Sequence, residues 1–193
     1  MDSYEVNLPP APIPVVSETI LAQKVKKARP YTLAQKSFTA AELAFWGESG
    51  ITQEVLKLFR VVSLMKFSSE NNEGKPFSIA ATDKEPVFGY TAKQYVKVYR
   101  PHSEMRFLYA GDFGENYCFG LEQLPAKGDL LFITGGEKDV MSLTAHGFHA
   151  ICFNSETVTI PVGIIHRLSF RFKHIVLLLS LIHISEPTRP EPI

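Results

Sequence analysis

The chain has 193 residues, of which 45% are hydrophobic and 21% are charged, as in a globular protein of one ordinary domain or two small ones. Its 20 Lys and Arg residues balance its 20 Asp and Glu residues, so no overall basic field predicts a nucleic-acid partner, and such a contact needs a local patch. The only two cysteines, Cys118 and Cys152, exclude a zinc ribbon or a disulfide framework within this chain. With no signal-peptide pattern and no apolar run long enough to cross a bilayer, we expect a cytoplasmic protein.

The density of prolines in residues 1–30 predicts a proline-rich linker or a disordered head. Prolines remove backbone N–H groups that a helix needs and favour an extended segment. The prolines are Pro9, Pro10, Pro12, Pro14 and Pro30. A small basic cluster follows, formed by Lys24, Lys26, Lys27 and Arg29. It is either a solvated face or a binding patch, and the sequence leaves both open.

Residues 31–126 predict an α+β domain. Thr39 and Glu42 have capping-box spacing before an apolar run, and Thr52 precedes a second short helical pattern. The spacing of the hydrophobic residues then changes to that of β-strands. These segments are rich in β-branched and aromatic residues and are separated by Asn, Gly and Pro. The strands are expected at residues 61–67, 77–81, 94–99 and 106–109. Their short connections favour antiparallel pairing.

Residues 127–179 predict a different architecture, in which strands and helices alternate. A buried strand, DLLFIT, is followed by the helix EKDVMSLTAH, which Gly147 ends as a left-handed residue. The strand HAICFN, a helix opened by Pro161 and the strand IVLLL follow. Apolar strands that alternate with helices imply a parallel sheet with right-handed crossovers.

Two glycines and two acids follow the first of these strands. Ligands of an open parallel sheet bind at the carboxyl ends of its strands, where Gly135 and Gly136 precede Glu137 and Asp139. Backbone N–H groups at a helix N-terminus can bind phosphate, and carboxylates can hold a divalent cation. The alternative is that these acids only complement the helix dipole. Glu156, just past the second strand, is a further carboxylate at this edge.

The segment LFITGGEKDVMSLTAHGFHAICFNSET resembles the TOPRIM domain of bacterial primases, phage and mitochondrial primase–helicases, and topoisomerases. That family has an E-G-x-x-D block after its first strand and a D-x-D pair after its third. Gly136 and Asp139 match the block, whereas Gly135 occupies the place of the family glutamate. Glu137, two residues on, is the candidate substitute, as in phage-type members with E-G-E. The resemblance implies an incomplete α/β TOPRIM domain of phage or mobile-element type.

The resemblance also implies chemistry for named residues. It assigns catalysis to Glu137 and Asp139, Mg²⁺ to the same two acids together with Glu156, and nucleotide contacts to Gly135, Gly136 and Lys138. The preceding domain of primase–helicases forms a basic groove, and the run KVYRPHSEMRF looks like part of it. Its matching candidates are Lys97, Arg100 and Arg106. Each of these is either a nucleic-acid contact or a surface charge on a half-exposed strand.

Residues 180–193 depart from the TOPRIM pattern. The string LSLIHISEPTRPEPI runs where the D-x-D pair is expected, and it resembles a translated sequencing adapter. We therefore expect a non-native tail, with the gene continuing to an Asp near position 180 and a second acid two residues later. A natural proline-rich tail is the alternative.

These observations predict a fragment of a DNA primase or primase–helicase. Its parent is expected to catalyse Mg²⁺-dependent nucleotidyl transfer on a single-stranded DNA template with nucleoside triphosphates and a helicase domain or partner, whereas this chain alone is expected to be inactive. The first alternative is a non-catalytic nucleic-acid-binding or replisome interaction module with a degenerate TOPRIM site. The second is a small-molecule α/β enzyme unrelated to replication. Recovery of the downstream sequence would separate the primase from the non-catalytic module, and the small-molecule enzyme should show no affinity for single-stranded DNA in a salt titration.

Overall fold

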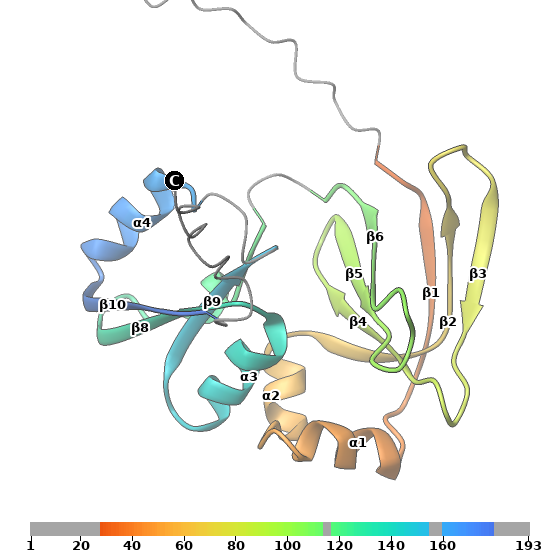
Figure 1. The fold of residues 1–193 in the computed structure, drawn as a ribbon, viewed down its shortest axis with the longest axis horizontal. Coiled ribbons are helices and arrows are strands. Elements are labelled where there is room, and N and C mark those ends of the chain that lie inside the picture. Colours follow the sequence, from red (N-terminus) through yellow and green to blue (C-terminus); the bar gives the residue numbers. More distant parts are fainter. Residues whose placement is uncertain (1–27, 114–116, 155–159, 180–193) are drawn as a thin grey trace, which may run out of the picture.

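The computed structural model describes residues 28–113, 117–154 and 160–179, which form two β-sheets that lie side by side with short helices against them (Figure 1). The expected head (1–30, except its last three residues), Glu156 and the expected tail (180–193) lie outside the described residues. In the part of the chain that is described, no helix has both the length and the apolarity needed to cross a membrane.

The first sheet is antiparallel throughout and has six strands. In chain order they are β1 (Tyr31–Lys36), β2 (Val61–Glu70), β3 (Pro76–Ala80), β4 (Val87–Thr91), β5 (Tyr95–Tyr99) and β6 (Phe107–Gly111). The order in the sheet is β1-β2-β4-β5-β6, and β3 pairs with the far half of the long strand β2. The four strands expected here are confirmed. β1 and β4 were missed, the latter because Pro86 and Gly89 indicate a turn in sequence, whereas Gly89 lies within the strand.

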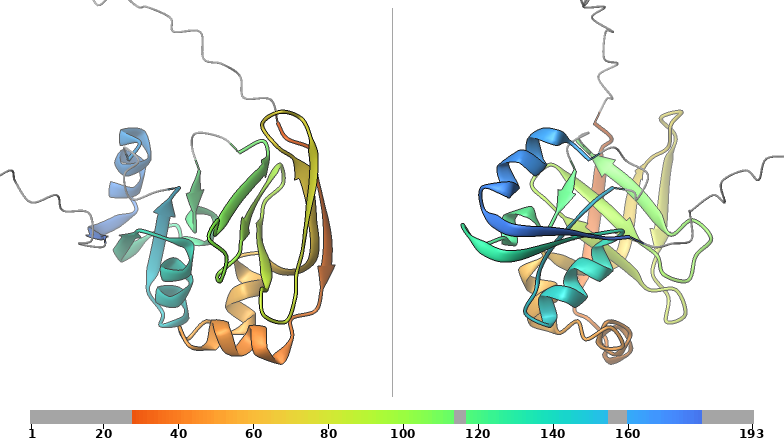
Figure 2. Two further views of the ribbon diagram at one scale, coloured as in Figure 1. Left: turned by 45° about the vertical axis from the view of Figure 1, so that its right-hand side comes forward. Right: turned by 60° about the vertical axis from the view of Figure 1, so that its left-hand side comes forward.

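This sheet curls until its outer strands meet (Figure 2). Just before β1, Arg29 forms a bridge with Gly111 at the end of β6. The enclosed core is apolar, which is why β2, β4 and β5 each place hydrophobic residues on this face. Its buried members are Leu64, Phe67, Val87, Val96, Val98 and Ala110.

Two short helices connect β1 to β2. α1 (Ala40–Gly47) begins at Thr39 with the expected capping box, and α2 (Gln53–Leu58) begins at Thr52, whose hydroxyl accepts the Val55 N–H. The Glu42 side chain of the capping box is buried, and it also accepts the Ser63 hydroxyl of β2. Burial of Glu42 raises its pKa, but the hydrogen bonds from the Thr39 N–H, Lys36 and Ser63 together lower it by more. The net pKa of Glu42 is therefore below its usual value.

The second sheet contains the expected parallel unit. Its strands are β7 (Cys118–Phe119), β8 (Gly128–Thr134), β9 (His149–Phe153) and β10 (Phe172–Leu178), in the order β10-β8-β9-β7. β8 is parallel to both β9 and β10, whereas β7 adds an antiparallel edge that the sequence analysis missed. A 3₁₀ turn (Leu121–Gln123) connects β7 towards β8.

Two helices cover opposite faces of this sheet. α3 (Glu137–Ala145) packs with Val140 and Met141 in one core cluster, and α4 (Val162–Ser169) packs with Ile164 and Leu168 in another. Gly147 has the expected left-handed conformation, with φ of 83°, directly after the α3 cap. The strand–helix alternation expected from the sequence is thus confirmed.

One core joins the two sheets. Its members come from α1, α2, the first sheet, α3 and the second sheet, and they are Trp46, Ile51, Leu56, Phe59, Val61, Phe88, Tyr90, Tyr117, Phe119, Val140, Met141, Ala150 and Cys152. α3 contributes Val140 and Met141 to this core, and its first residue, Glu137, contacts Lys97 of β5, so its first turn lies against the outer face of the curled sheet. The division into units 31–126 and 127–179 stays a prediction.

Candidate nucleotide and metal site

The carboxyl ends of three parallel strands lie at one edge of the second sheet. β8 ends at Thr134, β9 at Phe153 and β10 at Leu178. Gly135 and Gly136 follow β8 directly, and α3 begins at the next residue. The Gly-Gly-acid-Lys-acid turn therefore lies at the strand ends where open parallel sheets bind their ligands.

Asp139 is the exposed carboxylate of this turn. It belongs to the first turn of α3, and its Oδ2 atom would lie 3.6 Å from a Cβ atom added at Gly136. Its carboxylate thus lies beside the glycine turn, at the positive end of the α3 dipole.

Glu137 has a different environment, because it is 3% exposed and is bound from two sides. The Lys97 ammonium lies 2.5 Å from Glu137 Oε1, and the Tyr117 hydroxyl donates to the same oxygen at 2.8 Å. Glu137 was predicted as a metal ligand and catalytic acid, and those roles stay predictions. In the structure its carboxylate binds a cation supplied by the protein itself.

Lys97 is surrounded by aromatic rings. Its Nζ atom lies 4.6 Å from the centroid of Phe107, 5.5 Å from that of Tyr109 and 5.4 Å from that of Tyr117. Lys97 as a whole residue is 3% exposed, so the alternative of a surface charge on a half-exposed strand is wrong at this residue. The physical reason is that one face of β5 lines the curled sheet and the other packs against α3 and the second sheet.

Tyr117 completes the polar contacts of Glu137. Burial raises the pKa of Tyr117, and the negative charge of Glu137 raises it further, so the hydroxyl stays protonated and donates. Burial also raises the pKa of Cys118 to about 12 and that of Cys152 well above its usual value. Neither thiol has the low pKa of a reactive cysteine.

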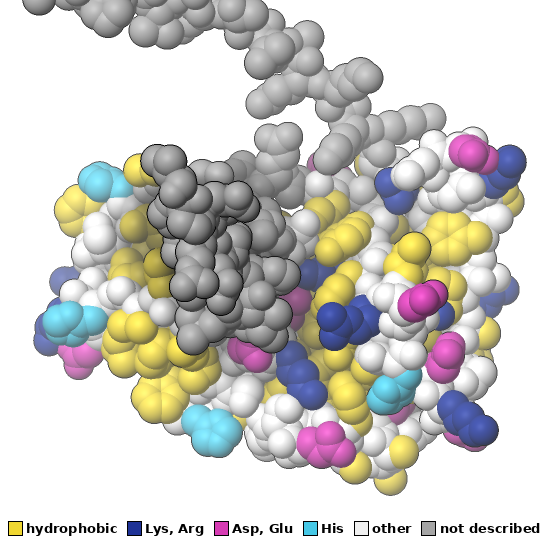
Figure 3. Space-filling view, viewed as in Figure 1, with side chains coloured by type: hydrophobic (Ala, Val, Ile, Leu, Met, Phe, Trp, Pro, Cys, Tyr) yellow, Lys and Arg dark blue, Asp and Glu magenta, His cyan; other side chains and the backbone are white. Residues whose placement is uncertain are grey.

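Three predicted basic residues lie nearer the surface. Arg106 is exposed, and Arg100 and Lys138 are partly exposed. Arg100 and Arg106 flank the β5–β6 connection, where the Arg100 N–H donates to the Arg106 carbonyl oxygen at 2.8 Å. Lys138 Nζ lies 4.4 Å from the centroid of Phe45 in α1. On the face of the molecule that is seen in Figure 3, basic and acidic side chains lie close together near the middle.

The described residues of the turn include one exposed carboxylate that could contribute to a Mg²⁺ site. Among residues 28–113, 117–154 and 160–179, no three His, Cys, Asp or Glu side chains group closely enough to hold a metal. Asp139 alone offers an exposed carboxylate at the turn. Mg²⁺ commonly takes one or two carboxylates together with substrate phosphates and water. Asp139 is therefore compatible with a metal that arrives with a nucleotide.

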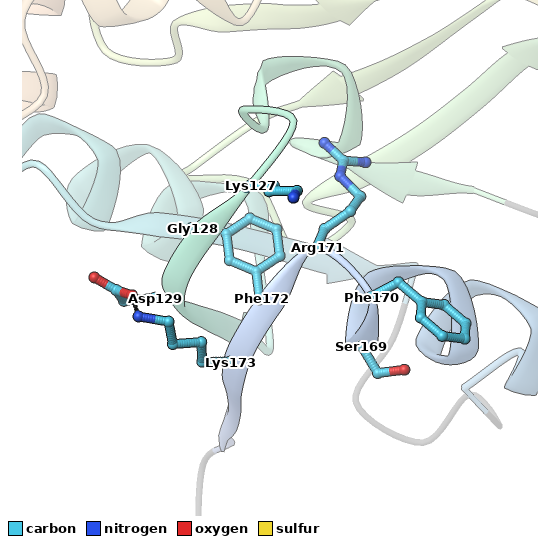
Figure 4. A pocket seen from close by; sticks show the side chains of 8 residues that line it. All are labelled: Lys127, Gly128, Asp129, Ser169, Phe170, Arg171, Phe172 and Lys173. Carbon is cyan, nitrogen blue, oxygen red and sulfur yellow. Dashed lines mark ion pairs between the residues drawn. The ribbon is translucent and has the colours of Figure 1, made fainter.

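A shallow pocket lies at the opposite edge of the second sheet (Figure 4). It has a volume of about 380 Å³ and is formed where β8 and β10 begin, around Gly128 and Phe172. Lys173 and Asp129 form an exposed ion pair of 2.6 Å at its rim. Because this pocket is at the amino ends of the parallel strands, it is separate from the Gly135–Gly136 turn.

Neither the contact of Tyr117 with Glu137 nor the rings around Lys97 were predicted from the sequence. A tyrosine 20 residues before Glu137 has no motif spacing that would indicate a hydrogen bond to it. The signal that the sequence offers is alternation, which places Tyr95, Lys97 and Tyr99 on one face of β5. That face is aromatic, and an aromatic face indicates burial.

Comparisons with known proteins find similarity at the level of structure. No protein-family model and no curated protein sequence matches the chain. The DnaG primase catalytic domain bound to single-stranded DNA aligns with a TM-score of 0.53 and 14% identity, over 74% of this chain and 56% of that chain. The primase fragment of the bacteriophage T7 primase-helicase aligns with a TM-score of 0.48 and 14% identity, over 78% and 61%. A third match is a complex of the T7 lagging-strand DNA polymerase with T7 primase domains bound to an RNA/DNA hybrid and dTTP. It aligns with a TM-score of 0.49 and 12% identity, over 76% of this chain and 64% of that chain.

The DnaG alignment shows that this chain has a primase-like fold of mixed α and β structure. The chain spans 56% of that catalytic domain, so the activity of a whole primase is a proposal for this protein.

Proposed function

We propose that the chain is a TOPRIM-type module of a DNA primase or primase–helicase. The observation that carries this proposal is the Gly135–Gly136 turn and Asp139 at the carboxyl edge of a parallel β10-β8-β9 sheet, within a primase-like fold. The intact protein would synthesise primers on single-stranded DNA from nucleoside triphosphates, with a helicase as domain or partner.

Asp139 would hold Mg²⁺ together with the phosphates of the nucleotide. The bound metal would neutralise phosphate charge and help to align the attacking hydroxyl. The backbone N–H groups at the start of α3 would bind a phosphate oxygen, which the dipole of this helix favours. Glu156 remains a proposed further ligand outside the described residues.

Arg100, Arg106 and Lys138 would contact the nucleic-acid backbone. They are the predicted basic residues with solvent-exposed surface. Arg100 also lies 3.7 Å from Glu85, a contact that a phosphate could replace because Glu85 is exposed. Lys97 is buried and would contribute only indirectly.

A second candidate function is a non-catalytic nucleic-acid-binding or replisome interaction module. Two observations favour it: Gly135 stands where the TOPRIM family has glutamate, and the Glu137 carboxylate is bound to Lys97. A module of this kind would bind single-stranded DNA without any dependence on Mg²⁺.

The test compares the wild-type chain with Asp139→Asn in two binding assays, one with a fluorescent nucleoside triphosphate and one with a fluorescent single-stranded DNA, each with and without Mg²⁺. The proposal expects Mg²⁺ to strengthen nucleotide binding in wild type and to have at least a tenfold smaller effect in the variant. Asp129→Asn, an exposed acid at the opposite edge of the sheet, is the matched control. DNA binding without any Mg²⁺ effect would favour the non-catalytic module, and absence of DNA binding would contradict both.

A further inference from the structure

Lys97 and Glu137 connect two parts of the molecule that are distant in sequence. Lys97 lies in the middle of β5 in the curled sheet, and Glu137 is the first residue of α3 in the second sheet. The two side chains are 4% and 3% exposed and approach to 2.5 Å. Such a contact orients α3 because any rotation of its first turn would separate the two charges inside the protein.

Inside the protein, the charge of Lys97 and the charge of Glu137 each depend on the other for stabilisation. Glu137 Oε1 receives the ammonium of Lys97 and the hydroxyl of Tyr117, whereas the rings of Phe107, Tyr109 and Tyr117 flank the ammonium. A buried charge costs much more free energy once its partner is lost than while the pair is intact. The aromatic faces favour a cation but cannot replace a carboxylate.

We propose that Lys97, Glu137 and Tyr117 form a positioning cluster that holds the first turn of α3 against β5 and so determines where Gly135, Gly136 and Asp139 lie. The inference rests on the proposed function in one respect, that this turn is the site. It gives Glu137 a role other than metal ligand, and Lys97 a role other than nucleic-acid contact. Their charges act on each other, and Asp139 is the carboxylate that meets the ligand.

Tyr117 places a third element in the same cluster. It directly precedes β7, the edge strand beside β9, so its hydrogen bond ties the second sheet to α3 and to Lys97. Its ring stacks on Phe113 at 4.8 Å and meets Tyr95 edge-on at 5.7 Å, which fixes the direction of the hydroxyl. Three elements therefore converge on one carboxylate oxygen.

The experiment is a double-mutant cycle with a structural readout. Lys97→Met and Glu137→Met each leave one buried charge unpaired, and each is expected to lower the folding equilibrium constant by about 100-fold or more. The double variant replaces the pair with apolar side chains of similar length and is expected to recover most of that loss. In each variant, the backbone amide NMR chemical shifts of Gly135 and Gly136 report whether the turn has moved.

Tyr117→Phe provides a variant that is expected to stay folded. It removes only the hydroxyl and should lower the folding constant about fivefold while it shifts the Gly135 and Gly136 amide resonances. Lys173→Met, at an exposed ion pair of the same sheet, is the control and should leave those resonances unchanged. Unchanged Gly135 and Gly136 resonances in Tyr117→Phe, or additive losses in the cycle, would overturn the proposal.

A Mg²⁺ titration separates positioning from ligation. If Glu137 positions the turn, the double variant binds Mg²⁺ within about threefold of wild type, whereas a ligand role predicts that every Glu137 variant loses binding. If the wild-type chain binds no Mg²⁺, the proposed metal function fails. The amide shifts and the cycle then still decide whether the cluster positions the turn.

Discussion

Gly111 and Arg29 exchange two backbone hydrogen bonds, of 2.8 and 3.4 Å, and so bring together the first and last strands of the curled sheet. Gly111 has a φ of 80°, and an added Cβ atom would lie 2.2 Å from the Gln94 carbonyl oxygen and 2.8 Å from the Tyr31 ring. The sheet can close at this point only around a residue without a side chain.

Gly111→Ala should therefore destabilise the protein by about 2 kcal/mol or more, because it combines left-handed strain with a backbone clash. The free energy of unfolding in urea measures the effect. Gly163→Ala is the matched control, since Gly163 lies in α4 with nothing within 4 Å of an added Cβ atom. It should change stability by about 1 kcal/mol or less, in the stabilising direction. Equal effects of the two changes would contradict the closure argument.

Glu42 should make stability depend on pH. Its folded-state pKa is lowered, so its contribution is fully present above the unfolded-state pKa of about 4.3 and is lost as the pH falls through the folded-state value. Glu42→Gln should cost about 1–3 kcal/mol at pH 7 and should flatten the loss of stability between about pH 5 and pH 3. Urea titrations across this range measure both effects. Glu73→Gln, at an exposed ion pair, should leave the pH profile unchanged.

Arg106 should act through phosphate charge. Arg106→Ala should weaken single-stranded DNA binding by about threefold to tenfold and should reduce the slope of log affinity against log salt by about 1. Fluorescence anisotropy at several salt concentrations measures both quantities. Lys75→Ala, on the exposed β2–β3 hairpin, is the control because it removes the same charge at a distant surface. A loss of affinity with an unchanged salt slope would indicate that Arg106 acts without contacting phosphate.

Gly135→Glu would introduce, directly after β8, the glutamate that the proposed TOPRIM function calls for. A second carboxylate beside Asp139 should strengthen Mg²⁺ binding by roughly an order of magnitude, since affinity for hard cations rises with the number of charged oxygen ligands. Isothermal titration with Mg²⁺ compares this variant with wild type. Gly135→Gln, of the same length but without charge, should show no such gain. Equal affinities for all three proteins would mean that this residue does not face the metal.

Sequence alone was sufficient where local chemistry decides the structure. The capping box of Thr39 and Glu42, the second cap at Thr52 and the left-handed Gly147 depend on contacts within a few residues, and all are as predicted. The parallel β8–α3–β9 unit was also predictable, because apolar strands that alternate with a helix have few other ways to pack. β4 was missed because the local signals of Pro86 and Gly89 indicate a turn, and pairing with β2 and β5 outweighs them.

Local pattern thus determined the helices, most of the strands and the turn at the end of β8 that leads to Asp139. Only the tertiary structure decided that Lys97 and Glu137, 40 residues apart, neutralise each other behind aromatic rings. Alternation along a strand tells which residues share a face, but whether that face meets water or a second sheet depends on how distant segments pack. That packing brings two residues, which the sequence predicted as contacts for nucleic acid and metal, into contact with one another.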